Sequence, residues 1–125
     1  MTPILFVLLS LAGGLGATAR LVVDGAIRTR VSGALPWGTI VINLTGSLAL
    51  GMLAGLSLGQ VVPESWHLVV GTGFLGGYTT FSTASFETVR LLQEREWRLG
   101  AVNGLGTLVC ATGAAGLGLW VGALF

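Results

Sequence analysis

Charged side chains are scarce in this chain of 125 residues, where Asp, Glu, Lys and Arg together make up 9%. Soluble domains carry roughly 25% charged residues, so this sequence cannot cover a water-exposed surface. Hydrophobic residues make up 53%. A helix needs about 20 mostly apolar residues to cross a hydrocarbon core of about 30 Å, and four such helices would use most of the chain. The composition therefore predicts an all-α integral membrane protein with short connections.

Lysine is absent, and the formal net charge is only +1. This balance argues against a nucleic-acid binder that works through a basic surface. The single cysteine, Cys110, cannot form an intrachain disulfide, and we expect it to be a packing residue. The sequence shows no paired nucleophile and base and no metal-ligand cluster, so an enzyme is not predicted.

Four helices are predicted within a single domain that covers residues 1–125. Their expected ranges are about 3–27, 37–58, 66–92 and 97–124. Pro3 suits a first helical turn, whereas the polar residues 93–96 must be a loop or a helix end. Because Met1 and Thr2 provide no basic n-region, we expect the first helix to remain in the protein rather than to be cleaved as a signal peptide.

Glycine contributes 21 residues, about twice its usual share of roughly 7%. Many glycines recur at four-residue spacing, which places them on one face of a helix. These sets are Gly51/Gly55/Gly59, Gly73/Gly77, Gly100/Gly104 and Gly118/Gly122. Small residues let helix backbones approach closely in lipid, so the pattern predicts tight packing within or between chains.

The middle of the predicted third helix is unusual. Residues 71–76 match G-x-G-x-x-G, but a dinucleotide site needs a preceding strand, and no alternating strand pattern is present. The glycines lead directly into Tyr78 to Thr83, which makes a poor continuous helix. The composition of this segment is compatible with two structures. One is a helix break whose freed carbonyls could bind Na⁺, and the other is an intact helix whose hydroxyls bond back to the preceding turn.

Neutral polar side chains recur at helical spacing on three of the predicted helices. They are Thr39, Asn43 and Ser47 on the second helix, Ser82, Thr83 and Ser85 on the third, and Asn103 and Thr107 on the fourth. Interhelical hydrogen bonds would explain any one set. Together the three sets favour an internal polar path. Amides and hydroxyls are neutral donors, and with the positive edges of aromatic rings they suit an anion.

Two ionisable residues, Arg20 and Glu87, lie within the predicted spans. Such residues are functional candidates by default, although Arg20 could instead reach the membrane interface or pair with backbone. The first helix has no carboxylate before Asp24. It therefore lacks the central carboxylate that a proton-coupled exporter needs.

Over essentially its whole length the chain resembles the bacterial fluoride channels, the Fluc or CrcB family. The most specific portion is GFLGGYTTFST, from Gly73 to Thr83, followed by Glu87 and Thr88. Further matches are GGLGATAR, which ends at Arg20, and PWGTIVINLTGS, which ends at Ser47. The resemblance implies a third helix broken near its middle, an antiparallel dual-topology dimer, and passive fluoride export across the cell membrane.

The resemblance also implies roles for individual residues. The carbonyls of Gly76 and Thr79, with those of a second copy, would hold a structural Na⁺ at the dimer centre. The fluoride pathway would include Asn43, Phe81, Ser82, Thr83, Asn103 and Thr107, while Arg20 and Glu87 would have structural or electrostatic roles. Ala84 stands where the family usually has a second phenylalanine, and Asn103 stands at the position of a tyrosine. The aromatic box is therefore expected to be incomplete.

The arginines of the connecting loops favour a single orientation. Arg28 and Arg30 belong to the first loop and Arg95 and Arg98 flank the third, whereas the second loop has none. The positive-inside tendency then places both termini outside, yet an antiparallel homodimer needs both orientations. We favour the homodimer, and the alternative partner is an oppositely inserted homologue.

Rival functions are a small four-helix multidrug or cation exporter and a non-transporting membrane assembly subunit.

Overall fold

The computed structural model describes residues 1–125 and contains only helices and their connections, which confirms the all-α prediction. The first two passes are α1 (Pro3–Arg28) and α2 (Trp37–Leu58). The third consists of α3 (Glu64–Trp66), η1 (His67–Leu75), α4 (Gly76–Tyr78) and α5 (Phe81–Gln93). The fourth consists of α6 (Trp97–Ala101), η2 (Val102–Gly106) and α7 (Thr107–Ala123). The segments η1 and η2 are π-helical and lie in glycine-rich sequence.

Three of the helices are long and apolar enough to cross a membrane: Pro3–Arg28, Trp37–Leu58 and Trp97–Ala123. The third pass is not among them because the backbone of Thr79 and Thr80 is extended, and it separates α4 from α5. Only 6% of the first and last spans is buried within the chain. Most of their surface therefore needs lipid or another chain to cover it.

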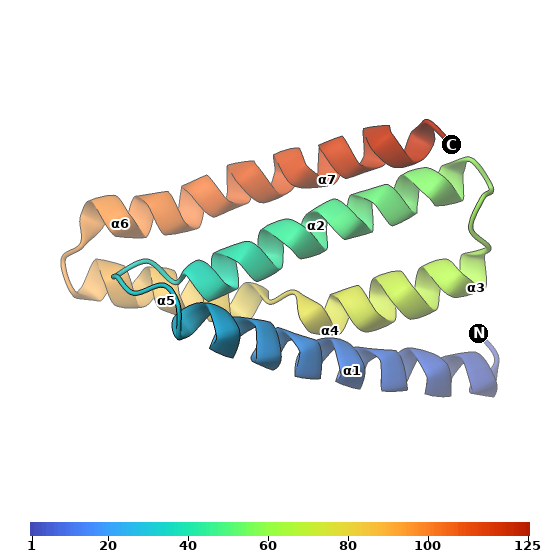
Figure 1. Ribbon diagram of the computed structural model, residues 1–125, viewed down its shortest axis with the longest axis horizontal. Coiled ribbons are helices and arrows are strands. Elements are labelled where there is room, and N and C mark those ends of the chain that lie inside the picture. Colours follow the sequence, from blue (N-terminus) through green and yellow to red (C-terminus); the bar gives the residue numbers. More distant parts are fainter.

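The four passes lie side by side (Figure 1), with α2 between α7 and the third pass and with both termini at the same end of the bundle. The packing agrees with this view, since α2 packs along α7 and α1 packs along η1 and α4. Ile42 of α2 and Leu91 of α5 are almost completely buried. The core thus lies around α2, whereas α1 and α7 form the outer sides.

The close approach of α2 and α7 depends on glycines from both helices. A Cβ atom at Gly51 would overlap the backbone of Ala115, and one at Gly118 would overlap the carbonyl of Leu48. Gly55 and Gly122 face the opposite helix in the same way. The prediction of tight packing is confirmed for these pairs.

The other glycine sets have different partners. A Cβ atom at Gly77 would overlap the carbonyl of Gly13 in α1, and Gly73 lies against the same helix. Gly100 and Gly104 face side chains of α5. Gly59 has only ordinary van der Waals neighbours, so close packing does not require a glycine there.

Candidate ion pathway

Thr79 and Thr80 link α4 to α5, and their polar groups end one helix and begin the next. The N–H and the hydroxyl of Thr79 both donate to the carbonyl of Leu75, at 2.9 Å and 3.0 Å. The hydroxyl oxygen of Thr80 accepts the N–H of Thr83 at 3.2 Å, which makes Thr80 the N-cap of α5. The break is therefore specified locally by two adjacent threonines.

Asn43 of α2 completes the break from the neighbouring helix. Its Nδ2 donates to the carbonyl of Thr80 and its Oδ1 accepts the N–H of the same residue, both at 2.9 Å. Because Thr80 is only 8% exposed, these peptide groups would otherwise be unpaired away from solvent. Gly46 leaves room at this point, since a Cβ atom there would overlap the methyl group of Thr79.

The break also frees backbone carbonyls on its α4 side. Among the hydrogen bonds of turns, loops and helix caps, none is accepted by the carbonyls of Gly76, Gly77, Tyr78 or Thr79, and no side chain donates to them. Gly76 is exposed, and a Cβ atom built on it would contact only the carbonyl of Gly71, in the preceding segment η1, at 3.8 Å. These neutral oxygens are available to a cation or to a second chain.

A groove of about 530 Å³ lies beside the break, between α2, α5 and the fourth pass. Its polar lining consists of Asn43, Ser47, Thr79, Thr80, Ser85, Thr88, Asn103 and Thr107. No charged residue lines it. The groove therefore offers amides, hydroxyls and backbone groups, which can donate hydrogen bonds without carrying a charge.

The structure brings together some of the predicted pathway residues. Asn43, Phe81, Asn103 and Thr107 line the groove, whereas Ser82 and Thr83 do not. Ser82 is exposed on α5. The hydroxyl of Thr83 is instead bonded to that of Thr80 at 3.2 Å.

The aromatic positions also differ in their surroundings. Phe81 is 88% exposed, so its ring projects from the chain at the edge of the groove. Ala84 lines the groove, and a phenylalanine at this position would enter it. Phe86 is 67% exposed and lies outside the groove, so it does not replace the missing ring.

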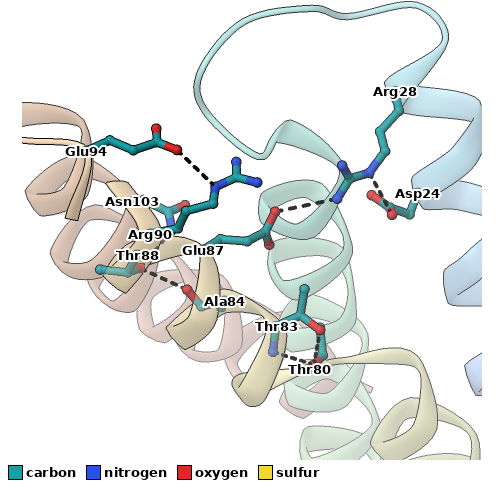
Figure 2. Close-up of polar contacts among 10 residues, drawn as sticks. All are labelled: Asp24, Arg28, Thr80, Thr83, Ala84, Glu87, Thr88, Arg90, Glu94 and Asn103. Carbon is teal, nitrogen blue, oxygen red and sulfur yellow. Dashed lines mark hydrogen bonds and ion pairs between the residues drawn. The ribbon is translucent and has the colours of Figure 1, made fainter. Parts of the chain in front are cut away.

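Asn103 connects the fourth pass to α5. It is only 3% exposed, and its Nδ2 donates to the Thr88 hydroxyl at 2.8 Å. Thr88 in turn donates to the carbonyl of Ala84 at 2.8 Å, and Figure 2 shows both bonds. Sequence reasoning noted Thr88 only as part of the family motif and assigned it no role, although its position three residues after Ser85 extends the polar face of the same helix.

Arg28 links two carboxylates at the end of the bundle away from the termini (Figure 1, Figure 2). Its Nε lies 2.8 Å from Oδ2 of Asp24, and its Nη2 lies 3.5 Å from Oε2 of Glu87. Arg20 Nε, Asp24 Oδ1 and Glu87 Oε1 are buried without a hydrogen-bond partner in the chain. Sequence reasoning singled out Arg20 and Glu87 but not the pairing with Arg28, because Arg28 and Glu87 lie 59 positions apart.

Comparison with known proteins supports one family over nearly the whole chain. A fluoride-specific ion channel FluC 1 of Leifsonia xyli is 53% identical over 124 residues, which are 99% of this chain and 90% of that protein. A FluC 2 of Cutibacterium acnes is 45% identical over 113 residues, 90% of this chain and 92% of that protein. A FluC 2 of Mycobacterium tuberculosis is 39% identical over 121 residues, 97% of this chain and 93% of that protein. Since residues 7–119 also match the family model described as "CrcB-like protein, Camphor Resistance (CrcB)", the chain belongs to the CrcB family.

Proposed function

We propose that this chain is a fluoride-selective ion channel of the cell membrane, which exports fluoride passively and lowers its concentration in the cytoplasm. The observation that carries the proposal is the groove beside the break, where amides and hydroxyls lie among apolar side chains and glycines, with no charged side chain in the lining. The relatives compared above are named fluoride-specific ion channels, which supports the same cargo.

The physical basis is the replacement of water. Fluoride is small and strongly hydrated, so donors along its path must take the place of its water shell, and binding must stay weak enough for the ion to leave. Asn43 keeps one Nδ2 hydrogen after its bond to Thr80, because an amide nitrogen carries two. The ring edge of Phe81 adds a weakly positive surface. Of the remaining donors on the proposed path, Asn103 and Thr107 line the groove. Ser82 and Thr83 also belong to the proposed path, but they lie outside the groove of a single chain.

The proposed functional unit contains two copies inserted in opposite orientations. Phe81 is 88% exposed at the edge of the groove, and only 6% of the first and last spans is buried within one chain. A second copy would cover these surfaces and would close the open side of the groove. An oppositely oriented homologue is the alternative partner, and it would meet the same surfaces.

The break fits a structural Na⁺ shared by the two copies. The carbonyls of Gly76 and Thr79 accept no side-chain hydrogen bond and none of the turn and cap bonds, and unwound backbone carbonyls are known ligands of Na⁺ in membrane proteins. When bound, the ion would supply positive charge that holds carbonyls from both chains together. Asn43 and the two threonines of the break hold the backbone that presents these oxygens.

Neither rival function gains support from the geometry. A proton-coupled exporter needs an available carboxylate on the first helix, but Asp24 is paired with Arg28 at 2.8 Å near the end of α1. An assembly subunit would account for the glycine contacts between helices. It would not account for the uncharged polar lining of one groove.

Fluoride efflux from liposomes that contain the purified protein tests the proposal. A fluoride electrode would follow release of fluoride, with chloride release measured in parallel and protein-free liposomes as the control. We expect rapid release of fluoride and negligible release of chloride. Absence of fluoride release from folded protein, both alone and reconstituted with an oppositely oriented homologue, would contradict the proposal.

A further inference from the structure

Glu87 is the only charged residue that the helices bury, at 5% exposure. It follows Thr80 and Thr83 on one face of α5, at spacings of three and four residues, so it extends the row of hydroxyls that begins at the break. Figure 2 shows its carboxylate directed toward α1, away from Thr88. A negative charge at this position opposes the passage of an anion unless a cation neutralises it.

Arg28 is the only cation that pairs with Glu87, at 3.5 Å between Nη2 and Oε2. Arg90, on the same helix as Glu87, faces Glu94 instead, at 3.9 Å. Arg20 forms no ion pair. Neutralisation of Glu87 therefore depends on one guanidinium from another helix.

Asp24 holds that guanidinium in place. It lies one turn before Arg28 on α1 and bonds its Nε at 2.8 Å. The Asp24 carboxylate itself packs against Gly38 at the start of α2, where a Cβ atom would overlap it. The planar guanidinium can bind two carboxylates at once, which a compact ammonium group does less well. The Arg28 side chain is 58% exposed, and its bond to Asp24 holds the guanidinium on the side that faces Glu87.

We propose that Arg28 is a positioning residue for fluoride permeation, which neutralises Glu87 and keeps its carboxylate turned toward α1. This inference rests on the proposed channel function. Removal of Arg28 leaves a buried carboxylate without its partner, on the face of α5 that carries Thr80 and Thr83. The uncompensated negative charge then acts on the fluoride pathway from beside it, and the rate of permeation falls.

The test measures initial fluoride efflux for Arg28→Gln in two backgrounds, the natural sequence and Glu87→Gln. In the natural background we expect a loss on the order of tenfold, which is the effect of one charge at roughly 10 Å in an effective dielectric of about 20. In the Glu87→Gln background the same substitution should lower the efflux rate by less than about twofold, because the two residues act through one contact.

Arg28→Lys, which keeps the charge, should recover part of the efflux rate. Arg90→Gln is the matched control, since it removes an exposed pair on the same helix, and it should leave efflux unchanged.

An equal loss in both backgrounds would overturn the inference, because Arg28 would then act independently of Glu87. Unchanged efflux in Arg28→Gln would overturn it as well. Size-exclusion elution and thermal unfolding check that each variant is folded. If Arg28→Gln alone does not fold, the doubly substituted protein must still conduct like Glu87→Gln, and failure to do so counts against the inference. Absence of fluoride efflux from the natural protein, both alone and with an oppositely oriented homologue, would instead refute the channel function itself, so the two failures are distinguishable.

Discussion

The amide of Asn43 bonds both the N–H and the carbonyl of Thr80, so α2 holds the extended backbone that interrupts the third pass. Thr79 and Thr80 supply the remaining hydrogen bonds within their own segment. A residue of the proposed pathway therefore also holds the backbone on which that pathway is built. Its substitution should affect stability and permeation together.

Asn43→Ala should lower both quantities. It leaves the N–H and the carbonyl of Thr80 without partners, and an unsatisfied buried group costs about 1–3 kcal/mol. We expect a lower midpoint of thermal unfolding in detergent and loss of fluoride efflux. The control is Ser10→Ala, because Ser10 is exposed and bonds only the carbonyl of Phe6 in its own turn. A variant with unchanged unfolding midpoint and unchanged efflux would show that Asn43 holds neither the break nor the ion.

At the scale of helices, close contacts at glycines allow particular helices to pack against each other. Gly51 and Gly55 of α2 meet Gly118 and Gly122 of α7 across an interface where backbones touch. In lipid this contact replaces the hydrophobic force that pairs helices in water. The α2–α7 pair is therefore the closely packed side of the groove, whereas the third pass supplies the break.

Gly51→Leu should separate α2 from α7. Its side chain would enter the backbone of Ala115, and overpacking of a close contact costs roughly 1–3 kcal/mol or more. We expect lower yield of monodisperse protein and a lower midpoint of thermal unfolding. Gly113→Ala is the comparison, because nothing lies within 4 Å of a Cβ atom at that glycine of α7. Equal behaviour of the two variants would contradict the proposed role of the α2–α7 contact.

Much of the helical structure could be predicted from the sequence, because hydrophobic length and glycine spacing are local properties. The partners of each helix could not, since the contact of Gly51 with Ala115 joins distant segments. The site was predicted in part. Asn43 and Asn103 lie in the groove, but Ser82 does not, because the extended residues before α5 set which face of that helix turns inward.

At the scale of the whole molecule, the proposal requires a second copy and a shared ion. The exposed Phe81, the free carbonyls of the break and the open outer helices all lie on surfaces that one chain leaves uncovered. Assembly and ion binding should therefore be linked. Any ion that binds only the assembled state stabilises it by mass action.

Replacement of Na⁺ by a large organic cation should destabilise the protein. Stabilisation by a ligand reaches about 2.7 kcal/mol at one hundred times its dissociation constant. We expect the midpoint of thermal unfolding to rise with Na⁺ concentration at constant ionic strength, with K⁺ as the control ion. A midpoint that does not respond to Na⁺, or that responds equally to K⁺, would contradict a specific Na⁺ site at Gly76 and Thr79.

The most direct test of the central claim is electrical recording from the purified protein in a planar bilayer, with a fluoride gradient and equal chloride on the two sides. The account predicts a current that flows without any coupled ion gradient and reverses at the equilibrium potential of fluoride. A current that reverses at the chloride potential, or the absence of current from protein shown to be folded and inserted, would contradict the claim that this chain conducts fluoride selectively.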